Sequence, residues 1–326
     1  MSFRTRWHYY RRIFSAYLGS GRSQLTFWHE VPEANPRASR DRLGEYYMLF
    51  REKADYAGHH DADGVPMLDY HGTIGLRYNP IAIAQWGLGN YNLLSEAQFE
   101  SRWQKAKAAA DWLCKNLQQN SQGLWVWNHH FDWEYRDTLK APWYSGLAQG
   151  QGISLLLRVH AHSGEEKYRE AAQRAFIPLT KDVGSGGVLF EDQNKNIWIE
   201  EYLVNPPTHI LNGFMWALWG VFDYWIVSQE TEVRELFNRG ASTVLANLAH
   251  YDTGYWSLYE QSGTRLKMLA SPFYHRLHIV QLRIMTMLTG SSLFNDVANR
   301  WEGYLRSPAN RRRALVGKAL FKLLYY

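Results

Sequence analysis

The sequence has 326 residues and a mass of 38.1 kDa, which allows one large domain or two ordinary ones with a substantial hydrophobic core. Its 46% hydrophobic and 21% charged residues exclude a disordered chain and a coiled coil, and no apolar stretch approaches the roughly 20 residues that span a bilayer. The net charge of +5 arises at the two ends, because residues 25–305 contain 25 basic and 31 acidic side chains, so we do not expect a nucleic-acid-binding protein.

The first segment, residues 1–60, is predicted to be a basic and aromatic N-terminal arm. Residues 1–24 contain arginines and no acidic residue, but they lack the continuous apolar stretch of a secretion signal. A helix is expected near residues 40–55. The sequence His60-Asp61-Ala62-Asp63-Gly64 is similar to part of a calcium loop, but it lacks the later glutamate ligand and is more typical of a plain turn.

Residues 61–305 are predicted to form one helical domain, because apolar residues recur there at three- and four-residue spacing. The expected helices cover residues 81–94, 96–120, 143–162, 165–177, 210–228, 230–249, 275–288 and 293–305. Three times, a strongly apolar helix is followed by a polar turn and a more charged helix, with a period of about 61 to 65 residues. This alternation predicts an all-α dominant fold, an (α/α) toroid in the form of an incomplete barrel of helical hairpins.

Three segments between the helices are expected to form short β-hairpins at one rim of the toroid, at residues 123–128, 187–202 and 252–265. In such a ring, the ends of the inner helices and the rim loops form the cleft, so polar residues there are the site candidates. Aromatic residues make up 15% of the chain. This composition suits a carbohydrate site, because a flat ring covers a sugar face while its OH or NH group meets hydroxyls.

The last segment, residues 306–326, is predicted to be a basic amphipathic tail, since it carries arginines and lysines without an acidic residue. Together with the N-terminal arm, such a tail suits an anionic membrane face, and the alternative is a solubilising, frayed terminus. We therefore expect a cytoplasmic protein with peripheral contact to the inner membrane through the basic tails.

Three clusters of polar and aromatic residues are candidates for the site, namely Trp198–Tyr202, Tyr251–Tyr259 and Pro272–His278. Each cluster precedes a strongly apolar helix of the predicted inner ring. A carboxylate, phenol or imidazole at such a place can reach the cleft, and a helix N-terminus favours anionic groups. The alternative is that these tyrosines cap and pack the helices.

The sequence resembles the C-terminal domain of the D-glucuronyl C5-epimerases, the heparosan and heparan glucuronate 5-epimerase type. The resemblance rests on Tyr78–Leu88, Trp143–Gln151, Trp198–Met215, Tyr251–Gly254 and Tyr274–Gln281, in order and with similar spacing. It implies an (α/α) toroid and an isomerase that converts D-glucuronate to L-iduronate in a glycosaminoglycan such as heparan sulfate. It also implies a glucuronate-containing anionic polysaccharide as the partner, and a homodimer formed through this domain.

Carried over residue by residue, the resemblance implies that the catalytic acidic residue is Glu201 and that the catalytic tyrosines are Tyr202, Tyr259 and Tyr274. It implies substrate contacts at Tyr78, Trp143, Tyr144, Gln149, Asn212 and His278. The candidates for holding the uronate carboxylate are Arg265, His275 and Arg276.

Inversion at C5 requires removal of a proton next to a carboxylate and delivery of another on the opposite face, so two groups must flank the sugar. A cation must also neutralise the developing dianion. We expect Glu201 to be ionised and to act as the base, with Tyr274 as the proton partner and Tyr202 and Tyr259 in support. The sequence has no phosphate loop, dinucleotide fingerprint or nucleophile elbow, so we expect no organic cofactor, and we expect no metal.

Two other functions stay open at this point. A uronate polysaccharide lyase on the same fold removes the same C5 proton and then expels the C4 substituent instead of reprotonating the carbon. A non-catalytic glycan-binding module would use the aromatic cleft without any turnover.

Overall fold

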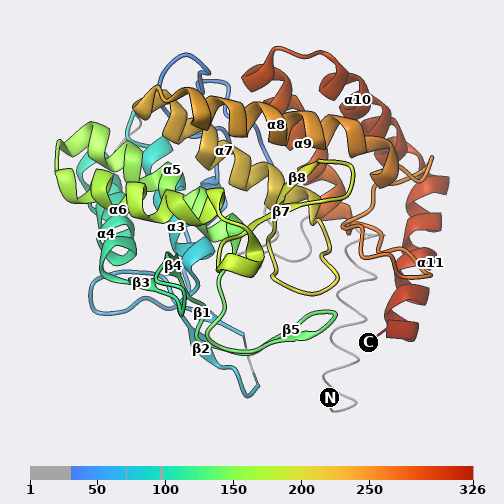
Figure 1. Ribbon diagram of the computed structural model, residues 1–326, viewed down its shortest axis with the longest axis horizontal. Helices are drawn as coiled ribbons and strands as arrows, with labels where there is room; N and C mark the ends of the chain where they lie inside the picture. The colour runs from blue at the N-terminus through green and yellow to red at the C-terminus, as the bar shows by residue number, and fades with distance from the viewer. Residues whose placement is uncertain (1–30, 71, 96–97, 326) are drawn as a thin grey trace.

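A computed structural model describes residues 31–70, 72–95 and 98–325. Within these residues, the main helices pair into antiparallel hairpins, and each hairpin has one inner and one outer helix. The inner helices are α3 (Pro80–Asn92), α5 (Gly146–Ser163), α7 (Leu211–Ser228) and α9 (Pro272–Thr289), and the outer helices are α4 (Phe99–Lys115), α6 (Glu166–Phe176), α8 (Thr231–Asn247) and α10 (Leu293–Arg306). Figure 1 shows them as an arc that runs from α4 and α6 on one side to α10 on the other.

The inner helices contact one another in chain order, α3 with α5, α5 with α7 and α7 with α9, and each outer helix packs on its own inner partner. The difference in sequence explains the layers. Helix α7 is apolar around its whole circumference and is buried from Leu211 to Tyr224, whereas α8 and α10 carry one apolar stripe each. The predicted helix-dominant (α/α) toroid is therefore confirmed.

The inner helices α3, α5 and α9 begin at side-chain caps. The side chain of Asn79 accepts hydrogen bonds from the backbone of α3, and Pro80 occupies its first position. Ser145 caps α5 and Ser271 caps α9 in the same way. Such caps satisfy backbone N–H groups that have no partner within a helix, and they fix where these three helices start.

Helices α5 and α7 approach each other closely at two glycines. A Cβ atom added to Gly220 would lie 2.3 Å from the carbonyl oxygen of Gly150, and one added to Gly150 would lie 2.5 Å from the Cα of Ala217. Only residues without a side chain fit at this crossing, so the sequence sets the spacing of the two central helices.

Short antiparallel strand pairs connect the hairpins (Figure 1). The pairs are β1 (Leu68–Asp69) with β2 (Leu76–Arg77), β3 (Leu117–Gln119) with β4 (Trp125–Trp127), β5 (Trp133–Glu134) with β6 (Thr138–Leu139), and β7 (Leu189–Glu191) with β8 (Ile197–Ile199). Short 3-10 turns cover Ile177–Thr180, Val183–Ser185 and Leu248–Tyr251. Hairpins are thus found at two of the three expected places, and residues 252–265 contribute only isolated bridges, Asp252 to Ser257 and Leu258 to Leu269.

The predicted arm lies outside the described residues up to residue 30, and the rest of it packs on the toroid. A helix was expected near residues 40–55, but only α2 (Arg51–Ala54) forms. The reason is that the side chain of Asn92 accepts a hydrogen bond from the backbone of Tyr46 and donates one to the carbonyl of Met48, which replaces helical bonds. Tyr46 and Met48 are buried, so this segment belongs to the core.

A buried ion pair joins this segment to the inner helices. The guanidinium of Arg158 donates to Asp223 across α5 and α7 at 2.6 and 3.1 Å, and the two side chains are 1% and 0% exposed. Arg158 also donates to the carbonyl of Gly44, and the hydroxyl of Tyr47 donates to Asp223. These bonds satisfy both charges in the interior.

The basic tail forms helix α11 (Pro308–Tyr325), which packs against the segment that follows Tyr255. The ammonium of Lys318 donates to the carbonyl of Leu269, and Arg313 stacks on the ring of Tyr255. Across the described residues, no helix is long and apolar enough to pass through a membrane.

Candidate active site

A cavity of about 220 Å³ lies where the inner helices begin. It is lined by Ile81 of α3, Leu147 of α5, Asn212 of α7 and Tyr274 of α9, each in the first turn of its helix. The N-terminal ends of these inner helices therefore meet at one place. Each end carries a partial positive charge, so together they favour an anionic ligand.

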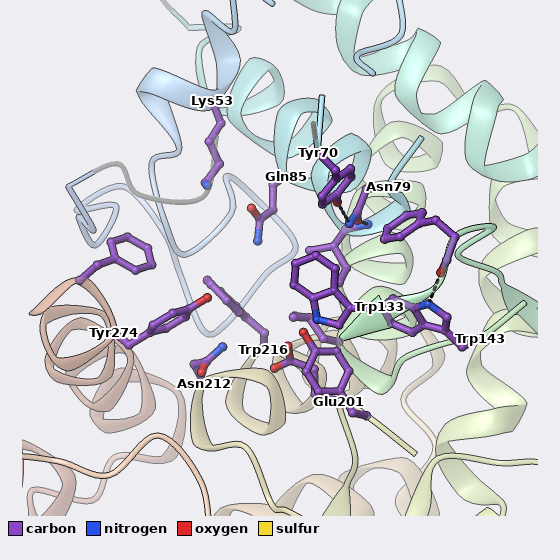
Figure 2. Close-up of a pocket in the computed structure, with 15 residues that line it drawn as sticks. Lys53, Tyr70, Asn79, Gln85, Trp133, Trp143, Glu201, Asn212, Trp216 and Tyr274 are labelled. Carbon is purple, nitrogen blue, oxygen red and sulfur yellow. Dashed lines mark hydrogen bonds between the residues drawn. The ribbon is translucent and has the colours of Figure 1, made fainter. Parts of the chain in front are cut away.

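Aromatic side chains from the rim cover one side of the cavity. Tyr70, Phe131, Trp133, Trp143 and Tyr202 line it, and all five belong to one apolar cluster beside the strand pair β5–β6. Two hydrogen bonds fix this wall in Figure 2, from Trp143 Nε1 to the carbonyl of Phe131 and from Asn79 to the hydroxyl of Tyr70. Flat rings with polar edges suit the face of a pyranose.

The predicted acid and phenol reach this cavity from different elements. Glu201 follows strand β8, and Tyr274 lies in the first turn of α9 behind the Ser271 cap. Figure 2 shows Glu201 and Tyr274 on different sides of the cavity, with Asn212 from α7 between them. A ligand in this cavity can therefore meet a carboxyl group on one side and a phenol on the other.

Glu201 is 5% exposed, and its Oε2 atom has no hydrogen-bond partner in the described residues. Burial raises the pKa of this carboxyl to about 8, although a hydrogen bond with Tyr202 acts in the opposite direction. The expectation that Glu201 is ionised near pH 7 is therefore wrong, because the buried carboxyl holds its proton more tightly than an exposed one. Gly213 leaves the space for this group, since a Cβ atom there would lie 2.1 Å from Oε2.

The neighbouring carboxylate, Glu200, points away from the cavity and fixes the loop. Both the Nδ1 atom and the backbone N–H of His209 donate to Glu200, at 2.5 and 3.2 Å. The ring of His209 stacks on Trp198 with centroids 4.2 Å apart, and its carbonyl accepts from the hydroxyl of Tyr251. Side chains alternate along an extended chain, so anchoring Glu200 turns Glu201 toward the cavity.

Tyr259 supports Tyr274 without being part of the cavity wall. The two rings make an edge contact with centroids 4.8 Å apart, and their hydroxyls are hydrogen-bonded. Burial raises the pKa of both phenols, and the nearby Glu201 raises them further. The pKa of Tyr202 is raised for the same reasons. These hydroxyls are therefore protonated at neutral pH, and Tyr274 can act as a proton donor.

Several buried polar atoms at the cavity have no partner within the described part of the chain. They are Gln85 Oε1, Glu201 Oε2, Asn212 Oδ1 and Trp216 Nε1. Buried polar groups are nearly always hydrogen-bonded, so this concentration indicates a polar ligand. Asn212 and Trp216 are four residues apart on α7 and share one face of the helix.

Some residues that the sequence indicated as substrate contacts have other roles in the structure. The hydroxyl of Tyr78 donates to Asp61, that of Tyr144 to the carbonyl of Gly186, and the amide of Gln149 to two backbone carbonyls. Asp61 also accepts from two backbone N–H groups, as in the plain turn that was expected.

The predicted histidines and arginines also lie outside the cavity lining. His275 and His278 are buried beside the hydroxyl of Ser257, and they hold α9 in place. Arg265 is exposed on the loop after Tyr259, and Arg276 is half-buried on α9. Arg265, His275 and Arg276, the candidates for holding the uronate carboxylate, therefore do not border the cavity, which corrects that expectation.

Sequence reasoning missed several lining residues. Lys53 of α2, Gln85 of α3 and Trp216 of α7 reach the cavity, as do Tyr70 and Trp133 from the rim. The density of tryptophans around Trp133 was a usable signal for the aromatic wall. No local pattern marked Lys53, because it comes from the segment that was predicted to be an arm.

Comparisons with known proteins agree with this architecture. A sequence model described as the D-glucuronyl C5-epimerase C-terminus matches residues 119–303. A D-glucuronyl C5-epimerase of Caenorhabditis elegans is 34% identical over 213 residues, which is 60% of this chain and 34% of that protein. An uncharacterized protein of Methanocaldococcus jannaschii is 26% identical over 179 residues, which is 54% of this chain and 56% of that protein.

Among solved structures, an unsaturated glucuronyl hydrolase of Bacillus sp. GL1 aligns with a TM-score of 0.48 and 15% identity, over 69% of this chain and 61% of that one. The chain spans between a third and somewhat more than half the length of the curated relatives that it matches. The matched segment covers most of the toroid and includes Glu201, Asn212 and Tyr274. By this match over more than half of its length, the chain belongs to the family defined by the C-terminal domain of the D-glucuronyl C5-epimerases.

Proposed function

We propose that this protein is a uronate C5-epimerase that converts D-glucuronate to L-iduronate residues within an anionic polysaccharide of the heparosan type. The observation that carries the proposal is that Glu201 and Tyr274 line one cavity, at the meeting point of the inner helix N-termini. The family and the relative from Caenorhabditis elegans support the same activity.

In the proposed reaction, the ionised form of Glu201 removes the C5 proton and the electron pair of the C–H bond moves into the uronate carboxylate. The hydroxyl of Tyr274 then gives its proton to C5 on the opposite face, which restores the carboxylate and leaves a phenolate. Exchange of protons with solvent returns both groups to their starting forms. The two groups supply general base and general acid catalysis.

The dianion that forms in this step needs stabilisation at its oxygens. The indole N–H of Trp216 is buried without a partner within the described residues, and Asn212 lies one turn earlier on the same face of α7. These two side chains and the helix N-termini are the groups we assign to the reacting carboxylate. They act by fixed dipoles, which cost little reorganisation when the charge develops.

The test is NMR of heparosan incubated with the enzyme in heavy water. The wild-type protein is expected to incorporate deuterium at C5 in an intact polymer and to form iduronate. Tyr274→Phe is expected to lose at least about a hundredfold in rate, because removing a general acid or base costs this much. Tyr255→Phe is the matched control, since Tyr255 lies on Arg313 of the tail.

Three results would contradict the proposal. Depolymerisation with new ultraviolet absorbance from an unsaturated uronate would identify a lyase. Binding of heparosan by a wild-type protein that exchanges no C5 hydrogen would identify a glycan-binding module. Unchanged exchange in Tyr274→Phe would remove that tyrosine from the mechanism.

For the location of the protein, we propose contact with the cytoplasmic face of an anionic membrane through α11. Arg311, Arg312 and Val316 are exposed on this helix, and the chain has no acidic residue after Glu302. Basic residues near an anionic surface contribute about 1 kcal/mol each. Sedimentation with vesicles of phosphatidylglycerol is expected, and Arg311→Glu with Arg312→Glu should abolish it. Equal binding to phosphatidylcholine would contradict the proposal.

The homodimer stays a prediction, which light scattering can test.

A further inference from the structure

One cation borders the cavity among the lining residues that the structure describes, and it is Lys53. This lysine is 4% exposed, and its ammonium lies 5.7 Å from the centre of the Phe50 ring. Figure 2 shows its side chain entering from the α2 side, while Glu201 and Asn212 lie at the opposite end of the view and Gln85 lies between them. A buried ammonium in a cavity wall attracts an anionic group of the ligand.

The position of Lys53 is fixed by the packing of α2 on α3. The carbonyl of Phe50 approaches α3 so closely that a Cβ atom at Gly89 would lie 2.6 Å from it. The side chain of Asn90 donates to the carbonyl of Ala54, and Arg102 pairs with Asp55 at 2.7 Å. The backbone on both sides of Lys53 is therefore held, and the ammonium is presented from a rigid wall.

The reacting carbon has to lie between Glu201 and Tyr274. A sugar held there has its carboxylate near Asn212 and Trp216, so the α2 end of the cavity is left for the next sugar of the polymer. We propose that Lys53 forms a subsite that binds an acidic group of a sugar near the reacting uronate in the polymer, either the carboxylate of the flanking uronate or a sulfate of the amino sugar between them. The inference rests on the proposed function, and it makes the enzyme selective for a polymer with repeated negative charge.

The experiment compares Lys53→Met and Lys53→Arg with the wild type on synthetic hexasaccharides, by deuterium incorporation at the central uronate. The first substrate has a carboxylate on every uronate. In the second, only the central uronate keeps its carboxylate and the flanking ones are reduced to alcohols. The third is the second with N-sulfated amino sugars beside the centre.

Lys53→Met is expected to raise KM on the first substrate roughly tenfold or more, the usual effect of losing a charge-assisted hydrogen bond. It should change KM on the second substrate less than about twofold, which also shows that the variant is folded. Lys53→Arg should recover most of the loss. Restored sensitivity on the third substrate would show that Lys53 also binds the sulfate of the amino sugar, and its absence there would restrict the subsite to the carboxylate of the flanking uronate.

An equal effect of Lys53→Met on the first and second substrates would overturn the subsite, because Lys53 would then act on the reacting sugar or through the fold. No effect on any of the three would also overturn it. If the wild type exchanges no C5 hydrogen, the proposed function fails while the subsite is still testable. Calorimetric binding of the first two hexasaccharides by wild type and Lys53→Met then shows whether Lys53 distinguishes them.

Discussion

At the scale of single residues, the proton affinity of Glu201 follows from its position. The carboxyl lies in a wall made of Gly213, Tyr202 and the start of α7, where water is largely excluded. Its pKa of about 8 places it near the pH at which a general base works best, since it can be deprotonated at modest cost and holds a proton firmly afterwards. An exposed glutamate would be a much weaker base.

The raised pKa of Glu201 predicts a pH dependence of stability. In the folded protein the carboxyl titrates at about 8, and in the unfolded chain near the ordinary value of 4.5, so between these pH values the folded state holds one proton more. The free energy of unfolding should therefore decrease as pH rises through this interval, by up to about 1.4 kcal/mol per pH unit. Urea denaturation of the wild type and Glu201→Gln at several pH values checks this, and the difference between them should grow with pH. Parallel curves would show that Glu201 has an ordinary pKa.

Gly213 gives a second prediction at this scale. Gly213→Ala would place a methyl group 2.1 Å from Glu201 Oε2, so the carboxyl must move. We expect kcat to fall by about a hundredfold, since a displacement of about 1 Å can cost this much. Gly303→Ala is the control, because a Cβ atom there has open space in an outer helix. Equal kcat in the two variants would show that the position of Glu201 is not decisive.

At the scale of elements, the crossing of α5 and α7 is a close backbone contact that positions the site. Gly220→Ala would bring a Cβ atom to 2.3 Å from the Gly150 carbonyl, and backbone cannot move aside as a side chain can. We expect a loss of about 3 kcal/mol in unfolding free energy, at the upper end for overpacking. Thermal and urea denaturation measure it against Gly303→Ala, which should be neutral or slightly stabilising. A loss below about 1 kcal/mol would mean that the helices can separate.

The elements show what sequence alone could predict. The helices from α3 to α10 were found because a periodic apolar pattern is a local signal, and two of them start at the caps Ser145 and Ser271. The helix expected over residues 96–120 was too long, because α4 ends at Lys115 and residues 117–119 pair as strand β3. Only part of the site could be predicted, because the side chains of neighbouring residues reach different places in the structure. Trp143 lines the cavity, whereas Tyr144 donates to Gly186, outside it. Lys53 could not be predicted, because only packing brings α2 to the cavity.

At the scale of the whole molecule, the pair Arg158 and Asp223 joins the central helices α5 and α7 to the segment that contains Gly44 and Tyr47. Asp223→Asn leaves the buried guanidinium without its counter-charge, so we expect a loss of about 3–5 kcal/mol in unfolding free energy. The double variant Arg158→Met with Asp223→Leu should recover most of this, because no charge then stays buried. Urea denaturation of the single and double variants tests it. A double variant as unstable as the single one would show that packing, and not charge, is at stake.

The cavity is bordered by two kinds of segment, tightly packed helix ends and a short hairpin. The carboxyl and the phenol stand beside the glycine crossing and the cap of α9, whereas Trp133 lies in the short hairpin β5–β6 between α4 and α5, and Phe131 lies just before it. Exchange of that hairpin between related enzymes should therefore alter which polymer is accepted and leave the proton-transferring partners in register. Differences in substrate choice among related enzymes are therefore expected at this hairpin.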